Sequence, residues 1–261
     1  MLHYLYASTY TYIFLILFTS HSNMDTLVFF VGVIGNVISV LMLLSPGKTF
    51  VRIVKKKSTE EFESLPYICT LLNCELWTYY GIIKPDSYLV ATINAFGVVA
   101  EITYIALFLI FAPPNSNKRL NTALLVGIVN VGFVASTFLV TCFVLDGEDL
   151  RIDSIGFLSA ALNIIMYASP LSALKTVVTT KSAEFMPFLL TFFLFLNGGI
   201  WTFYAFLVQD WFLGVPNSIG FVLGALQLLL YAIYRNPTNS DEFETNQISQ
   251  TESLLPRSSI C

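Results

Sequence analysis

Charge is scarce in this chain. Only 11% of its 261 residues are Asp, Glu, Lys or Arg, while 56% are hydrophobic, and the mean hydropathy is +0.72. A water-soluble protein of this length needs more polar surface than that. The composition therefore excludes a soluble globule and indicates a membrane protein.

Histidine and cysteine are also scarce, with two and four copies. His3 and His21 precede the first long apolar segment, and Cys69, Cys74 and Cys142 lie in or beside apolar segments. The sequence contains no metal-ligand spacing, no disulfide framework, no glycine-rich phosphate loop and no nucleophile with a plausible base. We therefore expect neither an enzyme nor an ATP-driven pump, and no metal, cofactor or nucleic-acid partner.

Long apolar segments, by contrast, are abundant. Seven are long enough to cross about 30 Å of hydrocarbon as helices. They are Leu27–Ser45, Pro66–Ile83, Tyr88–Phe111, Leu120–Leu145, Ile155–Leu174, Pro187–Val208 and Phe212–Tyr234. The sequence therefore predicts an all-α membrane protein with seven transmembrane helices.

Six of these segments form two copies of one unit. Residues 163–234 align with residues 39–111 at an offset of 124, which places Asp210 on Asp86, and a residue lost after that point reduces the offset to 123. Such a repeat predicts two parallel three-helix units, with the fourth segment reversing the chain between them (3+1+3). The predicted parts are a first repeat at 24–112, a linker helix with its loops at 113–150, and a second repeat at 151–235.

Basic residues follow the odd-numbered segments, and by the positive-inside rule that face is cytosolic. The N-terminus is then extracytosolic and the C-terminus cytosolic. We expect residues 1–23 to be either a dispensable extension or a gene-model artefact, since their short apolar core lacks the basic flank of a signal peptide. Residues 236–261 are acidic and rich in Ser and Thr, and are expected to be a disordered cytosolic tail.

Matched amides lie at mid-membrane in the two repeats. The repeat aligns Asn94 with Asn217, and each amide offers both the donor and the acceptor that a polyhydroxylated ligand requires. A single Asn in a transmembrane helix more often bonds to a neighbouring helix. Two copies related by the repeat, however, lie where a repeat-built transporter binds its substrate. We therefore interpret them as a binding pair.

An indole lies beside an amide in each repeat. Asn73 and Trp77 are four residues apart and share one helical face, as do Asn197 and Trp201. An indole ring covers the apolar face of a sugar while the amide bonds to its hydroxyls. All four residues are therefore predicted to join the pocket.

Four prolines are also paired by the repeat. Pro46 and Pro170 are predicted to end the first helix of each unit, and Pro66 and Pro187 to open the second, since proline removes a backbone N–H and disfavours helix in the preceding residue. All four fall on the predicted cytosolic side. We interpret them as hinges of a cytosolic gate.

Short strings around these residues resemble the SWEET family of plant sugar transporters. They include Lys57–Ser58–Thr59–Glu60, Thr92–Ile93–Asn94, Tyr167–Ala168–Ser169–Pro170 and Pro216–Asn217–Ser218–Ile219. The resemblance covers residues 24–236 and implies bidirectional uniport of a mono- or disaccharide by alternating access, often as a homo-oligomer. The strings at 65–70 and 162–167 look most like the vacuolar branch associated with fructose and glucose, so the vacuolar membrane is expected, with the plasma membrane as the alternative.

The resemblance also implies roles for residues that match the family's motifs. Around the amides and indoles, the cavity would be sized by Ser39, Met42, Asn163 and Met166. An extracytosolic gate would be formed by Tyr80, Lys84 and Asp210.

Two acidic residues lie inside predicted helices. Glu75 comes two residues after Asn73 and points about 200° away from the pocket face, so we expect it to be protonated or paired with a neighbouring helix. An unpaired Glu there would cost about 2.5–3.5 kcal/mol on insertion scales. Glu101 shares the face of Asn94 and is interpreted as a structural hydrogen-bonding anchor, with proton coupling as the alternative.

Two other functions fit the same spans. A proton-coupled amino-acid exporter of the PQ-loop type shares the three-helix unit, but none of the four helix-end prolines here is followed by Gln. A non-transporting scaffold or receptor would have no use for matched polar pairs at mid-membrane. Sugar uniport is therefore the preferred interpretation.

Overall fold

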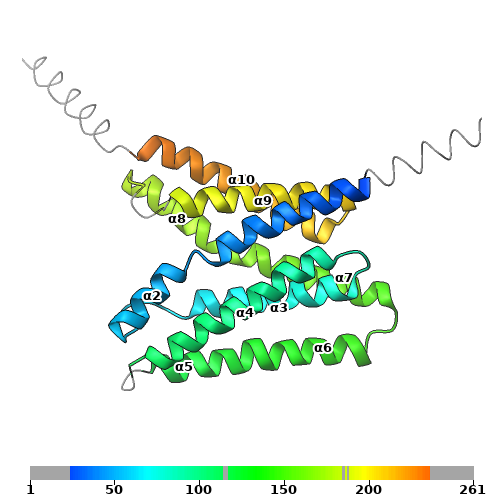
Figure 1. Cartoon of the computed structure of the whole chain (residues 1–261), viewed down its shortest axis with the longest axis horizontal. Coiled ribbons are helices and arrows are strands. Elements are labelled where there is room, and N and C mark those ends of the chain that lie inside the picture. The colour runs from blue at the N-terminus through cyan, green and yellow to red at the C-terminus, as the bar shows by residue number, and fades with distance from the viewer. Residues whose placement is uncertain (1–23, 114–116, 184–185, 187, 236–261) are drawn as a thin grey trace, which may run out of the picture.

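The computed structural model describes residues 24–113, 117–183, 186 and 188–235, and these are helical with short turns and no strand. The N-terminal helix covers residues 24–43 of this range. It is followed by α2 (Gly47–Lys56), α3 (Leu65–Ile83), α4 (Tyr88–Phe111), α5 (Lys118–Leu125), η1 (Val126–Phe133), α6 (Val134–Phe143), α7 (Glu148–Met166), α8 (Ala168–Thr180), α9 (Phe188–Val208) and α10 (Trp211–Tyr234) (Figure 1). The predictions for residues 1–23 and 236–261 lie outside the described residues.

Six helical stretches of the described chain are long and apolar enough to cross a membrane. The seventh predicted span is α3, which has 19 residues and packs against α4 and α7 (Figure 1). Its sequence is less apolar because several of its side chains face protein: Asn73 and Trp77, for example, line an internal cavity. The protein is therefore an all-α, multi-pass membrane protein with the predicted 3+1+3 arrangement.

The fifth span is longer than predicted. Helix α7 begins at Glu148 rather than at Ile155, and after a bend at Tyr167 the chain continues as α8 to Thr180. Carboxylates in a first helical turn, here Glu148 and Asp149, interact favourably with the helix dipole. Charged turns lower the apolar signal without ending the helix, so hydropathy alone misplaced this boundary.

The duplication is visible in the backbone. Helices α4 and α10 each contain 24 residues. Lys57 and Lys181, which follow α2 and α8, both adopt the left-handed conformation, with φ of 51° and 50°. These two residues stand at the offset of 124 that the sequence predicts.

One position of the predicted alignment is wrong. Asp86 and Gln209 are the left-handed residues of the loops before α4 and α10, with φ of 56° and 53°, so the offset is already 123 there. Asp210, the N-cap residue of α10, therefore corresponds to Ser87, the N-cap residue of α4, and not to Asp86. Loop residues carry no hydrophobic period, so the position of the lost residue could not be located from the hydrophobic pattern.

The first helix of each repeat packs against the other repeat. A Cβ at Gly32 of the N-terminal helix would lie 3.0 Å from the ring of Tyr204 in α9, and a Cβ at Gly156 of α7 would lie 2.9 Å from the ring of Tyr80 in α3. Both positions require glycine for this close approach. The two repeats are thereby interlocked, with the N-terminal helix against α9 and α7 beside α3 (Figure 1).

The prolines begin helices rather than end them. The N-terminal helix stops at residue 43 and Pro46 directly precedes α2, while α7 stops four residues before Pro170, which lies in the first turn of α8. The prediction that these two prolines end the first helices is therefore wrong in this respect. Proline is tolerated in a first turn because its missing N–H would have no helical partner there. Pro66 opens α3 as predicted, and Pro187 lies outside the described residues.

Aromatic side chains pack α2 against α3 and α4 within the first repeat. The ring of Phe50 stacks on Tyr104 of α4 with centroids 4.5 Å apart and meets Tyr67 of α3 edge-on at 4.9 Å. The hydroxyl of Tyr104 donates to the Leu43 carbonyl, at the break before α2, over 3.2 Å. The turn between the N-terminal helix and α2 is thus fixed by side chains of the same repeat.

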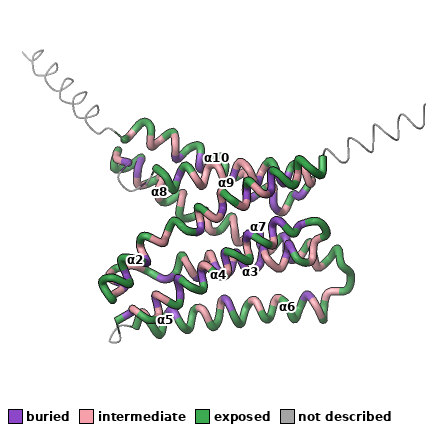
Figure 2. The backbone as a smooth tube through the Cα atoms, viewed as in Figure 1, coloured by how far each residue is buried: buried purple, intermediate pink, exposed green. Residues whose placement is uncertain are grey.

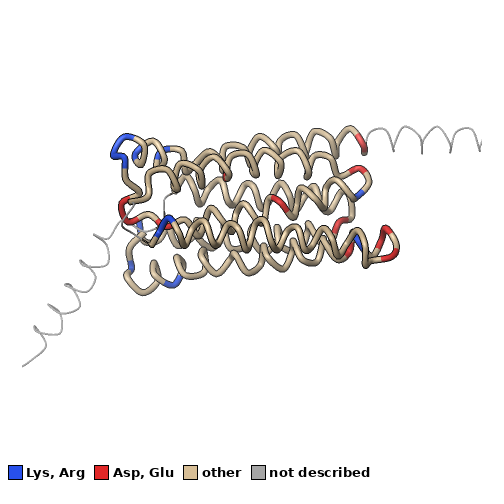
Figure 3. Tube along the Cα trace, turned by 90° about the horizontal axis from the view of Figure 1, so that it is seen from below, with Lys and Arg blue, Asp and Glu red and all other residues tan. Residues whose placement is uncertain are grey.

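The outer faces of the helices are exposed and apolar, as lipid-facing surfaces require (Figure 2), whereas charges lie mainly at the two ends of the bundle (Figure 3). We call one the basic end; its described basic residues are Lys48, Arg52, Lys55, Lys56, Lys57, Lys118, Arg119, Lys175, Lys181 and Arg235. We call the other the acidic end; among the described residues it carries Asp25, Asp86, Asp146, Glu148, Asp149, Asp153 and Asp210, and the basic residues Lys84 and Arg151. At the basic end, hydrogen bonds from Arg52 and Lys56 lower the pKa of Glu60.

Candidate functional site

A cavity of about 370 Å³ lies between the two repeats, a volume within the range of small-molecule sites. Its wall is built from the N-terminal helix, α3, α4 and α7 to α10. All ten residues predicted to contact the substrate line it: Ser39, Met42, Asn73, Trp77, Asn94, Asn163, Met166, Asn197, Trp201 and Asn217. The structure therefore brings the whole predicted set together in one place.

Asn94 and Asn217 have the same local geometry. Each Nδ2 donates to the carbonyl of the residue four positions earlier, Val90 or Leu213, over 2.8 Å. This bond uses one N–H and leaves the second N–H and the carbonyl oxygen of each amide. Each side chain is thus held by its own helix rather than by a neighbouring one, with a donor and an acceptor left for a ligand.

Asn197 and Trp201 of α9 are joined to the N-terminal helix through Ser39. The Ser39 hydroxyl donates to Asn197 Oδ1 over 2.5 Å and accepts a hydrogen bond from Trp201 Nε1 over 3.0 Å. These bonds fix the indole by its edge and leave its faces to pack. The resemblance had placed Ser39 in the cavity, but the link itself was not foreseen because residues 158 positions apart share no local pattern.

The first repeat lacks this link. The carbonyl oxygen of Asn73, the counterpart of Asn197, is buried and has no hydrogen-bond partner among the described residues. Trp77 is buried and meets Tyr80 edge-on, with ring centroids 5.3 Å apart. An unpartnered acceptor in a cavity wall is a place where a ligand hydroxyl gains a full hydrogen bond.

The wall continues towards the basic end. Met42 and Met166, equivalent by the repeat, line it, as do Pro46 and Pro170 four residues further along each chain segment. Pro66 lies at the same end but does not line the cavity. Of the three predicted hinge prolines that the structure describes, Pro46 and Pro170 border the cavity directly.

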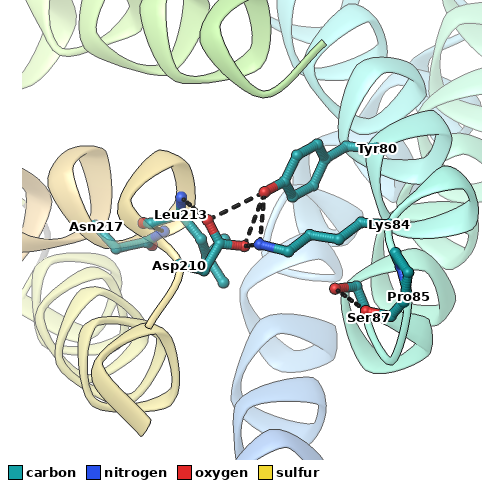
Figure 4. A network of polar contacts seen from close by, with 7 residues as sticks. All are labelled: Tyr80, Lys84, Pro85, Ser87, Asp210, Leu213 and Asn217. Atoms are coloured by element: carbon teal, nitrogen blue, oxygen red, sulfur yellow. Dashed lines mark hydrogen bonds and ion pairs between the residues drawn. The ribbon is translucent and has the colours of Figure 1, made fainter. Parts of the chain in front are cut away.

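Tyr80, Lys84 and Asp210 meet at the acidic end (Figure 4). The Tyr80 hydroxyl donates to both carboxylate oxygens of Asp210, over 3.1 and 2.9 Å. Lys84 Nζ lies 2.6 Å from Asp210 Oδ2 and donates to the Tyr80 hydroxyl over 2.9 Å. Asp210 also accepts from the Leu213 backbone N–H over 3.1 Å, which caps α10. The three residues predicted to form a gate thus make one network that joins the two repeats.

Glu75 is paired with the linker helix. Asn130, in the π-helical segment η1, donates from Nδ2 to Glu75 Oε2 over 3.1 Å and to the Ile68 carbonyl over 3.2 Å. The expectation of pairing with a neighbouring helix is confirmed. Because η1 packs against α3, the pair ties the linker helix to the first repeat.

Asn130→Ala should lower the thermal stability of the detergent-purified protein, because it removes the only described hydrogen-bond donor to Glu75. Hydrogen bonds between transmembrane helices contribute about 0.6–1.7 kcal/mol. Glu75→Gln should be milder, since an amide oxygen still accepts from Asn130. Ser136→Ala is the matched control, because that hydroxyl is exposed and bonds only within its own helix region. An Asn130→Ala protein that melts with the control would show that the pair contributes nothing to stability.

Glu101 does not behave as predicted. The side chain is buried and lines the cavity, yet its Oε2 has no hydrogen-bond partner among the described residues. The interpretation of Glu101 as a hydrogen-bonding anchor is therefore wrong. Its place on the face of Asn94 is confirmed, since both residues line the same cavity.

The family comparison matches the two repeats of the chain separately. Residues 29–116 and 153–239 each match the family described as sugar efflux transporters for intercellular exchange. The two matches begin 124 residues apart (153 − 29) and end 123 apart (239 − 116). The duplicated unit is therefore the unit that defines the family.

Individual relatives match over most of their length. The bidirectional sugar transporter SWEET17 of Arabidopsis thaliana is 58% identical over 208 residues, which cover 80% of this chain and 86% of that protein. SWEET16 of the same plant is 56% identical over 221 residues, covering 84% and 95%. A solved structure of a eukaryotic SWEET transporter is similar with a TM-score of 0.77 at 39% identity, covering 81% of this chain and 98% of that one. The chain belongs to the SWEET family of sugar transporters, and it is a transporter rather than an enzyme.

Proposed function

We propose that this chain carries hexoses, glucose and fructose among them, across the vacuolar membrane in either direction as a uniporter. One observation supports an alternating-access mechanism above all. The cavity between the repeats is sealed at the acidic end by the Tyr80–Asp210–Lys84 network, while Pro46 and Pro170 border it towards the basic end. By the positive-inside rule the basic end faces the cytosol, so this is a conformation with the lumenal side closed.

In the proposed cycle, one sugar ring occupies the level of Asn94 and Asn217. Their free amide groups bond to its hydroxyls, and Trp77 and Trp201 cover its apolar faces. The unpartnered carbonyl oxygen of Asn73 accepts a hydrogen bond from a further sugar hydroxyl. To release the sugar to the lumen, the acidic end must open while the proline-bordered mouth closes. Neutral sugar moves through this cycle without any charge crossing the membrane.

The test is uptake of labelled glucose into proteoliposomes that contain the purified protein, with and without an imposed pH gradient. Uniport predicts equilibration to the external concentration in both cases. Accumulation above that concentration, driven by the gradient, would contradict uniport and indicate a proton-coupled carrier. Amino-acid flux without sugar flux would favour the exporter alternative, and no flux of either would favour a scaffold.

The methionine pair predicts substrate size. Met42 and Met166 are long, unbranched side chains in the cavity wall, and they leave room for one sugar ring more readily than for two. Met166→Val shortens one of them, so we expect sucrose flux to rise relative to glucose flux. Met186→Val is the control, because Met186 is buried but does not line the cavity. An unchanged sucrose-to-glucose ratio in Met166→Val would assign selectivity to other residues.

A further inference from the structure

Glu101 is a carboxyl side chain that the proposed cycle leaves unused. It is 3% exposed and lines the cavity from α4, and its Oε2 has no partner among the described residues. It lies seven residues beyond Asn94, about 10 Å along the helix towards the basic end. A single sugar ring held by Asn94 and Asn217 is shorter than this, so Glu101 belongs to a separate level of the cavity.

The second repeat has different residues at this level. Helices α4 and α10 align at an offset of 123, so Glu101 corresponds to Gly224, where a Cβ would lie 2.8 Å from the Phe195 backbone. Gln227, the counterpart of Tyr104, is 4% exposed and lines the cavity. The three-helix unit therefore packs without a carboxylate at this position, and Glu101 is an addition specific to the first repeat.

The cavity wall offers Glu101 no cation. Among the described residues that line the cavity there is no Lys, Arg or His and no second carboxyl group. Two lining hydroxyls are already engaged with backbone carbonyls: Thr70 donates to Pro66 over 2.9 Å and Tyr167 donates to Pro216 over 2.7 Å. No described wall residue donates a hydrogen bond to Oε2 of Glu101, so the hydroxyl groups of a ligand in the cavity can supply its missing donors. Adjacent sugar hydroxyls are suitable, since a carboxylate accepts through two oxygens.

We propose that Glu101 and Gln227 form a second sugar position in this cavity, between the Asn94–Asn217 level and the basic end. The ligand is a neutral hexose that donates hydroxyl hydrogen bonds to the Glu101 carboxylate and exchanges hydrogen bonds with the Gln227 amide. In the conformation with the acidic end closed, the sugar stops here on its way to or from the cytosol. This inference rests on the proposed function and adds a position that the paired residues of the repeat do not provide.

The experiment measures equilibrium glucose binding and glucose exchange for purified parent protein, Glu101→Ala, Glu101→Gln and Gln227→Ala. We expect the dissociation constant to rise about fivefold or more in Glu101→Ala and less in Glu101→Gln, whose amide still bonds to hydroxyls. Gln227→Ala should also weaken binding. Glu75→Gln is the matched control, because Glu75 bonds to Asn130 and does not line the cavity. Should Glu101→Ala fail to fold, the isosteric Glu101→Gln and Gln227→Ala carry the same comparison.

The outcomes separate this proposal from the function on which it rests. If the parent binds and exchanges glucose and the Glu101 and Gln227 variants bind it as tightly as Glu75→Gln does, the second position is refuted and hexose transport stands. If the parent neither binds nor exchanges glucose, the proposed function itself fails. If Glu101→Gln binds normally but loses a pH-driven accumulation that the parent shows, Glu101 carries a proton and the sugar position is refuted.

Discussion

Asn94→Ala and Asn217→Ala are each expected to reduce glucose flux between about fivefold and a hundredfold. Each amide donates one N–H to a backbone carbonyl of its own helix, over 2.8 Å, and its remaining N–H and carbonyl oxygen are available in the cavity. Losing one amide leaves a sugar hydroxyl without its partner in an enclosed site, at a cost of about 1–3 kcal/mol. Labelled glucose uptake into proteoliposomes at matched protein amounts measures the effect.

The control for this prediction is Asn121→Ala, which removes an exposed amide of α5 outside the cavity. It should transport at the parent rate. Thermal melting of all three variants in detergent separates lost binding from lost folding. The hydrogen bonds removed from Asn94 and Asn217 lie within single helices, so the melting temperatures should change little. Normal flux in both Asn94→Ala and Asn217→Ala would falsify the assignment of the binding level.

The duplication made it possible to predict several residues that line the cavity. A single polar side chain that binds a ligand is hard to distinguish from one that only bonds to a neighbouring helix. A pair matched by the repeat, such as Asn94 and Asn217, instead indicates that both residues lie close to the axis that relates the two repeats. Helical period then fixed which residues join them: Trp77 lies one turn from Asn73 on the same face, and both line the cavity. The number of spans was predicted because apolar runs are long, and α4 is observed at the predicted bounds, whereas the fifth span begins seven residues earlier than predicted, at Glu148.

What the sequence did not show depends on contacts between distant segments. The bond from Ser39 to Asn197 joins helices of different repeats, and nothing local to either residue signals it. The orphaned oxygen of Glu101 is a property of the surrounding wall, so the sequence could place the side chain on the right face but not foresee that no donor meets it. The equivalence of Asp210 with Ser87 became clear only from loop conformation.

The Tyr80–Lys84–Asp210 network at the acidic end contains a charge that is almost wholly buried, and the second prediction with a large expected effect rests on this burial. The side chain of Asp210 is 2% exposed, whereas that of Lys84 is 24% exposed. Removing one partner of a buried ion pair costs about 3–5 kcal/mol when the remaining charge is left uncompensated. The loss should therefore depend strongly on which partner is removed.

Lys84→Met is expected to be the more damaging change, because it leaves the Asp210 carboxylate buried without its cation. Asp210→Asn leaves Lys84 able to reach water, and an Asn at this position still accepts from Leu213 and caps α10. Lys84→Met should thus lower the melting temperature and the glucose flux more than Asp210→Asn does. Because the proposed alternating-access cycle requires the acidic end to close once per cycle, a weakened network there should slow transport even where the sugar still binds.

The double variant decides whether charge is the cause. The combination of Lys84→Met with Asp210→Asn leaves no unpaired buried charge at the acidic end. Its melting temperature and glucose flux should therefore be higher than those of Lys84→Met alone. The Tyr80 hydroxyl still has an acceptor at residue 210 in that variant. A double variant that is no better than Lys84→Met, or a Lys84→Met protein milder than Asp210→Asn, would mean that packing around Tyr80 closes this end and that the ion pair adds little.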